Sequence, residues 1–240
     1  PAGEKAIFEY LASGAVKGIV ADMMADGTAA VAYALDTDLD DTTTTDREIA
    51  YAVIDKESGE VTRTIQATKD SYLDENPQLT SVKFGDAARF VLGWYTEQAV
   101  ASDGAEVLDG GESETSDETQ SDIRLMEFGA DGTTSQLLPD SMDQIASDYD
   151  VNITSNFRFT KSSETINDLS ILWVERAEEI TTNKDETSAM LVERDVLKGV
   201  KFYTHGAEQQ ISFTAAVDVA EMGDGTLIDH FDAYVSNPDT

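Results

Sequence analysis

Three aspartates at alternate positions give the chain its clearest arrangement of residues that could bind a metal. Asp36, Asp38 and Asp40 have the spacing with which a calcium-binding loop begins, and carboxylate oxygens are ligands that Ca²⁺ prefers. An EF-hand would continue with glycine at position 41 and glutamate at position 47, where this chain has Asp41 and Arg47. Asp36, Asp38 and Asp40 are therefore the candidate ligands of an irregular calcium site. The alternative is a solvated acidic loop without a metal.

Other metal and nucleophile chemistries have little support in the residue types. The two histidines, His205 and His230, are far apart in the sequence and no cysteine accompanies them, so a zinc site is not expected. The absence of cysteine also excludes disulfide bonds, thiolate ligands and a cysteine nucleophile. With two histidines and no Gly-x-Ser-x-Gly motif, a Ser-His-Asp triad is not expected either.

A repeated unit of four short strands forms the framework that must position these loops. Matching apolar runs, each pair separated by a long polar loop, occur at 31–35 and 49–54, at 90–95 and 123–128, and at 169–174 and 189–192. The units cover about 17–68, 77–138, 156–206 and 211–235, and a strand-like segment at 5–10 precedes them. Four-stranded units that repeat every ~50–60 residues are typical of radially stacked sheets.

The triplet Asp-Gly-Thr marks the turns of these units. It occurs at 26–28, 131–133 and 224–226, each time between two β-rich runs. Asp-Gly favours a tight hairpin turn because glycine accepts the positive φ that such turns require. We therefore predict a hairpin turn at each triplet.

Several strands are apolar on both faces, as expected for a sheet packed between two others. A sheet with one face in water would alternate apolar and polar residues. The runs at 49–54, 90–95 and 171–174 show no alternation of apolar and polar residues. Trp94 and Trp173 occupy the same place in their units, so we predict that both pack in the core between neighbouring sheets. The alternative is an aromatic platform for a ligand.

With these features the chain resembles the divergent propeller-like repeats of large bacterial surface and secreted proteins. The resemblance implies an all-β fold: one β-propeller-like domain over 1–240, with four-stranded antiparallel blades and about four units. Segment 5–10 is expected to pair with 227–235 and close the fourth blade. The alternative is that the chain is a fragment of a larger propeller, and its first residue, Pro1, is typical of a processed or excised piece. One short helix is expected at 141–146.

The long loops and the connectors between units should share one face, because connections in an antiparallel meander alternate between the two ends of the sheet. These segments concentrate the acidic residues of the chain. The stretch 96–120, for example, contains no lysine or arginine. One face of the molecule is therefore expected to be strongly negative.

The composition limits the classes of partner that the chain can bind. The 48 acidic and 16 basic residues give a net charge of −32, which would repel nucleic acid and anionic lipid, so neither is expected as a partner. No apolar run is long enough to span a bilayer, so membrane insertion is not expected. The acidity suits an extracellular or cell-surface protein, and the alternative is the cytoplasm of a high-salt organism.

The function expected from this resemblance is a non-catalytic extracellular module that binds or presents, with a protein or a glycan as its ligand and Ca²⁺ as its one candidate cofactor. The alternative is a carbohydrate-active, glycosidase-like propeller enzyme, because a pair of carboxylates can hydrolyse a glycosidic bond. Such groups would lie at the ends of the innermost strands, near Asp22, Gln78, Arg158 or Asp218. Nothing in the sequence marks two of these residues as a pair.

Overall fold

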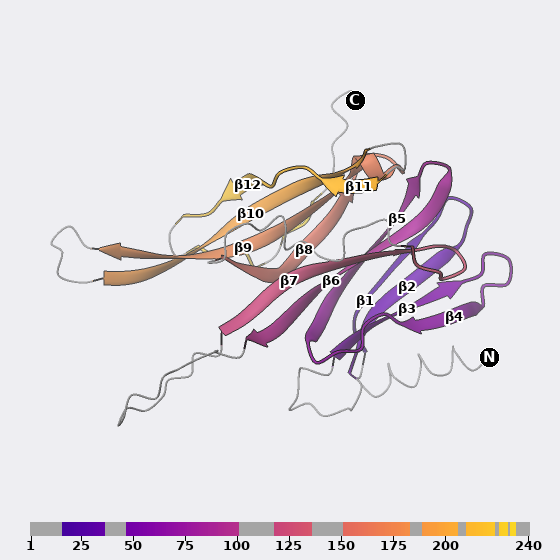
Figure 1. The fold of residues 1–240 in the computed structure, drawn as a ribbon, viewed down its shortest axis with the longest axis horizontal. Coiled ribbons are helices and arrows are strands. Elements are labelled where there is room, and N and C mark those ends of the chain that lie inside the picture. Colours follow the sequence, from indigo (N-terminus) through magenta and orange to yellow (C-terminus); the bar gives the residue numbers. More distant parts are fainter. Residues whose placement is uncertain are drawn as a thin grey trace.

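The structure is a computed structural model that describes residues 16–36, 47–100, 118–135, 151–182, 189–205, 210–223, 226–229 and 231–233. Within these residues the chain is almost entirely antiparallel β-sheet, which confirms the predicted all-β class. Three sheets stack against one another (Figure 1). The one helical turn in this part of the chain is the 3-10 helix η1 (Ile166–Asp168), so no helix there is long and apolar enough to cross a membrane. The helix expected at 141–146 lies outside the described residues.

The first sheet is a four-stranded meander that matches the first predicted unit. Its strands follow one another in sequence order: β1 (Val16–Met23), β2 (Ala29–Asp36), β3 (Arg47–Ile54) and β4 (Val61–Gln66). Residues Ile49 to Val53 of β3 are all buried, as the lack of alternation predicts.

The Asp-Gly-Thr triplets form the same turn in two different sheets. Gly27 has a φ of 93° and Gly132 a φ of 73°, so both use the conformation that favours glycine. The Asp26 carboxylate accepts a hydrogen bond from the Thr28 amide at 3.0 Å, and Asp131 accepts the same bond from Thr133 at 3.0 Å. The predicted turns are thus confirmed at 26–28 and 131–133, whereas the triplet at 224–226 is only partly within the described residues.

The second sheet has three strands within the described residues, whereas its predicted unit has four. The strands are β5 (Leu73–Phe84), β6 (Ala87–Val100) and β7 (Glu118–Phe128), again in sequence order. Where the fourth strand was expected to begin, the chain makes an isolated bridge between Phe128 and Thr134. The end of that predicted unit, residues 136–138, is outside the described part.

The third sheet corrects the predicted boundaries of the third and fourth units. It contains β8 (Val151–Lys161), β9 (Leu169–Thr182), β10 (Ala189–His205), β11 (Gln210–Phe213) and β12 (Val217–Glu221). The apolar run at 189–192, expected as a separate strand, is the first part of the continuous strand β10. The segment expected to open a fourth unit, 211–219, instead supplies β11 and β12, which both pair with β10. Its expected partner at 227–235 has no strand among residues 226–229 and 231–233.

Two hydrophobic cores separate the three sheets. The first core lies between the first and second sheets and includes Tyr51, Phe90, Trp94 and Phe128. The second core lies between the second and third sheets and is built around Phe157, Leu169, Ile171, Trp173 and Phe202. Trp94 is 7% exposed and Trp173 is 1% exposed, so the prediction that both pack in the core is confirmed. The second sheet is therefore covered on both faces.

Gly93, in the middle of β6, lets the second and third sheets approach closely. A Cβ atom at this position would lie 3.0 Å from Phe159 and 3.1 Å from Phe157, both on β8, and 3.2 Å from Leu125 on β7. These separations are shorter than ordinary carbon–carbon contacts, so any larger residue would push aromatic side chains of the second core.

Within the described residues the three sheets form an open stack, and their arrangement as blades of a propeller stays a prediction. The first strands of successive sheets pack next to one another, β1 against β5 and β5 against β8. No fourth sheet closes the stack within the described part of the chain. Segment 5–10, the expected closing strand, lies outside it.

Candidate functional site

The aspartates predicted to bind calcium are only partly within the structure. Asp36 is the last residue of β2; it is buried and stands opposite Arg47 of β3 in the strand register. Asp38 and Asp40 lie outside the described residues. A calcium site at these three positions therefore stays a prediction.

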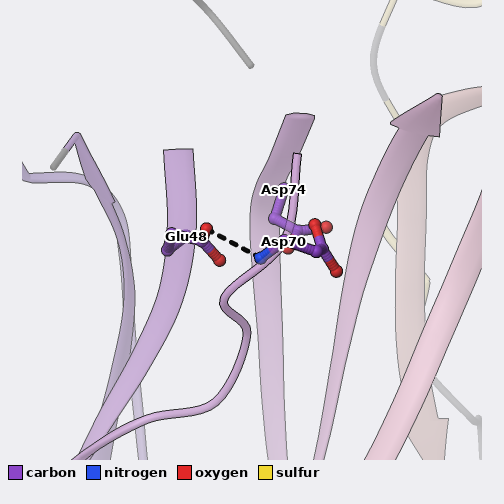
Figure 2. Close-up of side chains that lie close together, drawn as sticks. All are labelled: Glu48, Asp70 and Asp74. Carbon is purple, nitrogen blue, oxygen red and sulfur yellow. Dashed lines mark hydrogen bonds between the residues drawn. The ribbon is translucent and has the colours of Figure 1, made fainter. Parts of the chain in front are cut away.

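A different group of three carboxylates comes together where the first sheet meets the second. Glu48 belongs to β3, Asp70 to the connector after β4, and Asp74 to β5. One oxygen from each lies within 4.8 Å of the others. Figure 2 shows these three side chains gathered across the connector. Among the described residues this is the one group of three or more acidic or histidine side chains close enough to share an ion.

The connector between β4 and β5 is folded back on β3 by backbone hydrogen bonds, and this brings the three acids together. The amide of Ala67 donates to the carbonyl of Ile49 at 2.6 Å, and the amide of Ile49 donates to the hydroxyl of Thr68 at 2.8 Å. The Asp70 amide then donates to Glu48 Oε1 at 3.0 Å (Figure 2). Finally, Asp70 Oδ1 accepts the Tyr72 amide at 2.9 Å, a turn that directs the chain into β5.

Burial distinguishes the members of the group. Glu48 is 4% exposed and Asp74 is 1% exposed, whereas Asp70 is open to solvent. Asp74 Oδ1 accepts a hydrogen bond from the indole of Trp94 at 3.2 Å. The other oxygens, Glu48 Oε2 and Asp74 Oδ2, are buried and have no hydrogen-bond partner among the described residues. The group is thus an acidic site with one open side and two buried carboxylates that are only half satisfied.

The buried carboxyls are harder to ionise than ordinary ones. Burial raises the pKa of Asp74 to about 6, and the neighbouring Asp70 and Glu48 carboxylates add to that rise. Burial also raises the pKa of Glu48, and the hydrogen bond that Glu48 accepts from the Asp70 amide opposes that rise. In the absence of a cation, these two carboxyls therefore hold a proton more strongly than ordinary carboxyls do.

This pKa predicts a pH dependence of stability. Because the folded pKa of Asp74 is above its unfolded value, the folded state binds an extra proton between about pH 4 and pH 6, and stability falls as pH rises through that window. The expected contribution is at most about 3 kcal/mol in the free energy of unfolding. Urea unfolding in EDTA, measured from pH 4.5 to 7.5, should show this fall in the wild type and a shallower one in Asp74→Asn.

Glu57→Gln, which removes an exposed carboxylate, is the matched control and should keep the wild-type dependence of stability on pH. An unchanged slope in Asp74→Asn would contradict the assignment.

The carboxylates considered for glycosidase chemistry have structural partners. Asp22 accepts a hydrogen bond from the Ser81 amide at 2.7 Å and lies 3.8 Å from Lys161. Asp218 lies 4.0 Å from Lys198. Arg158 donates to the carbonyl of its own neighbour Phe157, and Gln78 donates to Asn76. None of the four expected positions bonds to another. His205 is the last residue of β10, and His230 is outside the described residues.

Glu48 was the signal in the sequence that could have pointed to the group. It is an acid in a strand whose following residues are apolar on both faces, and such a residue needs a specific partner. Comparison of the chain with protein-family profiles, with curated proteins and with solved structures gave no match. The function must therefore be argued from the geometry.

Proposed function

We propose that the protein is a non-catalytic binding or presentation module of an extracellular or cell-surface protein. The observation that carries this proposal is the hairpin of β9 and β10, which extends beyond the stacked sheets (Figure 1). Pairing of β8 with β9 stops at Ala177, and pairing of β12 with β10 stops at Val196. The outer five residue pairs, from Glu178 with Glu193 to Thr182 with Ala189, therefore have no third strand among the described residues.

An isolated two-stranded ribbon is marginally stable in water. Binding of a partner along the ribbon would therefore stabilise it. Its outer edges offer unpaired backbone groups to which an added strand of a protein partner could bond. The net charge of −32 favours a partner that supplies positive charge. A protein ligand with a basic extended segment fits these features, and a glycan is the other ligand class.

The propeller-like arrangement is part of the same proposal. It is supported by the adjacency of β1, β5 and β8, the first strands of the three sheets, which correspond to the innermost strands of successive blades. In such an arrangement the hairpin would extend outward from the third blade, where a ligand can reach it.

Binding to protein and glycan arrays tests the proposal. Replacing residues 180–191 by Asn-Gly shortens the hairpin with a turn that suits it. The shortened variant should keep the unfolding midpoint of the stacked sheets and lose the ligands that the wild type captures. Glu57→Gln, on the distant β3–β4 turn, should keep them. Unchanged binding by the shortened variant would contradict the proposal. Release of reducing sugar from a polysaccharide, abolished by Asp22→Asn or Asp218→Asn, would instead favour the carbohydrate-active enzyme.

A further inference from the structure

The buried carboxylates of this protein are neutralised in two different ways. Besides Asp36, six Asp and Glu side chains are buried among the described residues. Four of them lie within 4.0 Å of a lysine or arginine: Asp122 with Arg124, Glu127 with Arg89, Glu175 with Lys198, and Asp195 with Arg176. Glu48 and Asp74 differ, because neither has a basic nitrogen within that distance in the described part of the chain. A buried carboxylate without a positive partner is costly, so this pair calls for a charge from elsewhere.

Unsatisfied atoms converge on the same place. Glu48 Oε2 and Asp74 Oδ2 are fully buried without a hydrogen-bond partner in the described residues. The hydroxyl of Thr96 is also buried without a hydrogen-bond partner in the described residues. Thr96, on β6, stands directly opposite Asp74 of β5 in the strand register. Thr96 is 4% exposed. Three buried oxygen atoms without partners therefore belong to one site, and one of them is not a carboxylate.

The spacing of the acids fits a single hard cation. Two oxygens bound to one Ca²⁺ at ~2.4 Å can be at most ~4.8 Å apart, and the three carboxylates meet that limit within 4.8 Å. All the donors are oxygens, which excludes the nitrogen and sulfur ligands that zinc favours. Asp70 is exposed, so an ion can enter from solvent and keep some of its water.

We propose that a divalent cation, best matched by Ca²⁺, binds between Glu48, Asp70 and Asp74 and joins the first sheet to the second. Glu48 contributes from β3, Asp74 from β5 and Asp70 from the connector between them, with the Thr96 hydroxyl as a further ligand. The ion takes the place that lysine or arginine occupies beside the other buried carboxylates. This inference does not depend on what the module binds or on the projecting hairpin.

The two tryptophans provide an internal control for locating the ion. The Trp94 indole donates to Asp74, a member of the site. The Trp173 indole donates to Glu175 at 2.8 Å, and that carboxylate already has Lys198 at 2.7 Å. Tb³⁺, which takes the same oxygen ligands as Ca²⁺, luminesces when a nearby tryptophan is excited. The purified wild-type chain should give a saturable tryptophan-sensitised signal that Ca²⁺ displaces. Trp94→Phe should lose this signal and Trp173→Phe should keep it.

Thermal unfolding supplies a second measurement that does not depend on the tryptophans. Binding to the folded state alone should raise the Tm of the wild type on the order of 5 °C in millimolar Ca²⁺, compared with NaCl at equal ionic strength. Asp74→Asn, which keeps the shape of the side chain, should lose the rise, and Glu57→Gln should keep it. A Tb³⁺ signal that survives in Trp94→Phe would overturn the proposal. The same rise in Tm with Ca²⁺ in Asp74→Asn would also overturn the proposal. So would an unchanged Tm in the wild type, because a proton shared by the carboxyls would then explain the site.

Discussion

Replacing Asp195 by alanine should lower the free energy of unfolding by about 3–5 kcal/mol, the usual cost of breaking a buried ion pair. Asp195 is 0% exposed and lies in the part of β10 that pairs with β9. Its carboxylate accepts two hydrogen bonds from Arg176, at 3.0 Å from Nε and 3.3 Å from Nη2, and another from the Ile228 amide at 2.6 Å. The variant would leave a guanidinium and a backbone amide without their acceptor. Equilibrium urea unfolding measures the loss.

An exposed ion pair close to Asp195 provides the control. Glu221, on β12, pairs with Arg194 in an exposed position. Glu221→Ala should cost less than about 1 kcal/mol, because solvent screens such pairs. Since Asp195 lies at the base of the β9–β10 hairpin and also holds residue 228, its loss should loosen both. A cost below about 1 kcal/mol for Asp195→Ala would show that water replaces the bonds of this carboxylate.

Phe128→Ala should cost about 3–5 kcal/mol, the range for removing a buried aromatic side chain. Phe128 is 0% exposed and ends β7 in the first core. Its ring stacks on Tyr51 with centroids 4.0 Å apart, and it meets Phe90 at 5.2 Å. Tyr51 in turn donates its hydroxyl to the carbonyl of Gly132 at 3.0 Å, so the first sheet reaches into the Asp-Gly turn of the second. A cavity at Phe128 therefore weakens the contact between two sheets.

The measurement for Phe128 is again urea unfolding, with the change in slope recorded as well as the midpoint. Tyr203→Ala removes an aromatic ring at a position that is 40% exposed and should cost about 1 kcal/mol or less. Similar losses for the two variants would mean that the aromatic stack adds nothing beyond ordinary surface packing.

The turns and the first sheet could be predicted because their determinants are local. Asp and Gly at adjacent positions specify the bend, and the amide of the following threonine completes it at both 26–28 and 131–133. The bounds of β3 follow from an uninterrupted apolar run. The three-sheet stack follows less directly, from runs that are apolar on both faces.

The continuity of β10 could not be predicted, because it depends on contacts distant in sequence. Its middle, Glu193 to Lys198, reads as a charged break between two strands. In the structure Asp195 is buried against Arg176, and Lys198 neutralises Glu175, so these charges lie inside the sheet. The same limit applies to the candidate site. Asp36, Asp38 and Asp40 stand out through local spacing, whereas Glu48, Asp70 and Asp74 come together only when the connector folds back on β3.

The order of the strands has a consequence for how the chain acquires its structure. Each sheet is built from consecutive segments, 16–66, 73–128 and 151–221, and none of the described strands is exchanged between sheets. Pairings of this kind close short loops and can form as the chain emerges from a ribosome or a secretion pore, N-terminus first. The second sheet, however, needs a neighbour on each side. After it docks on the first sheet, Val91, Ile123 and Leu125 remain uncovered until β8 and β9 arrive. During that interval this bare apolar face is the surface that a chaperone, or another nascent copy of the chain, would meet.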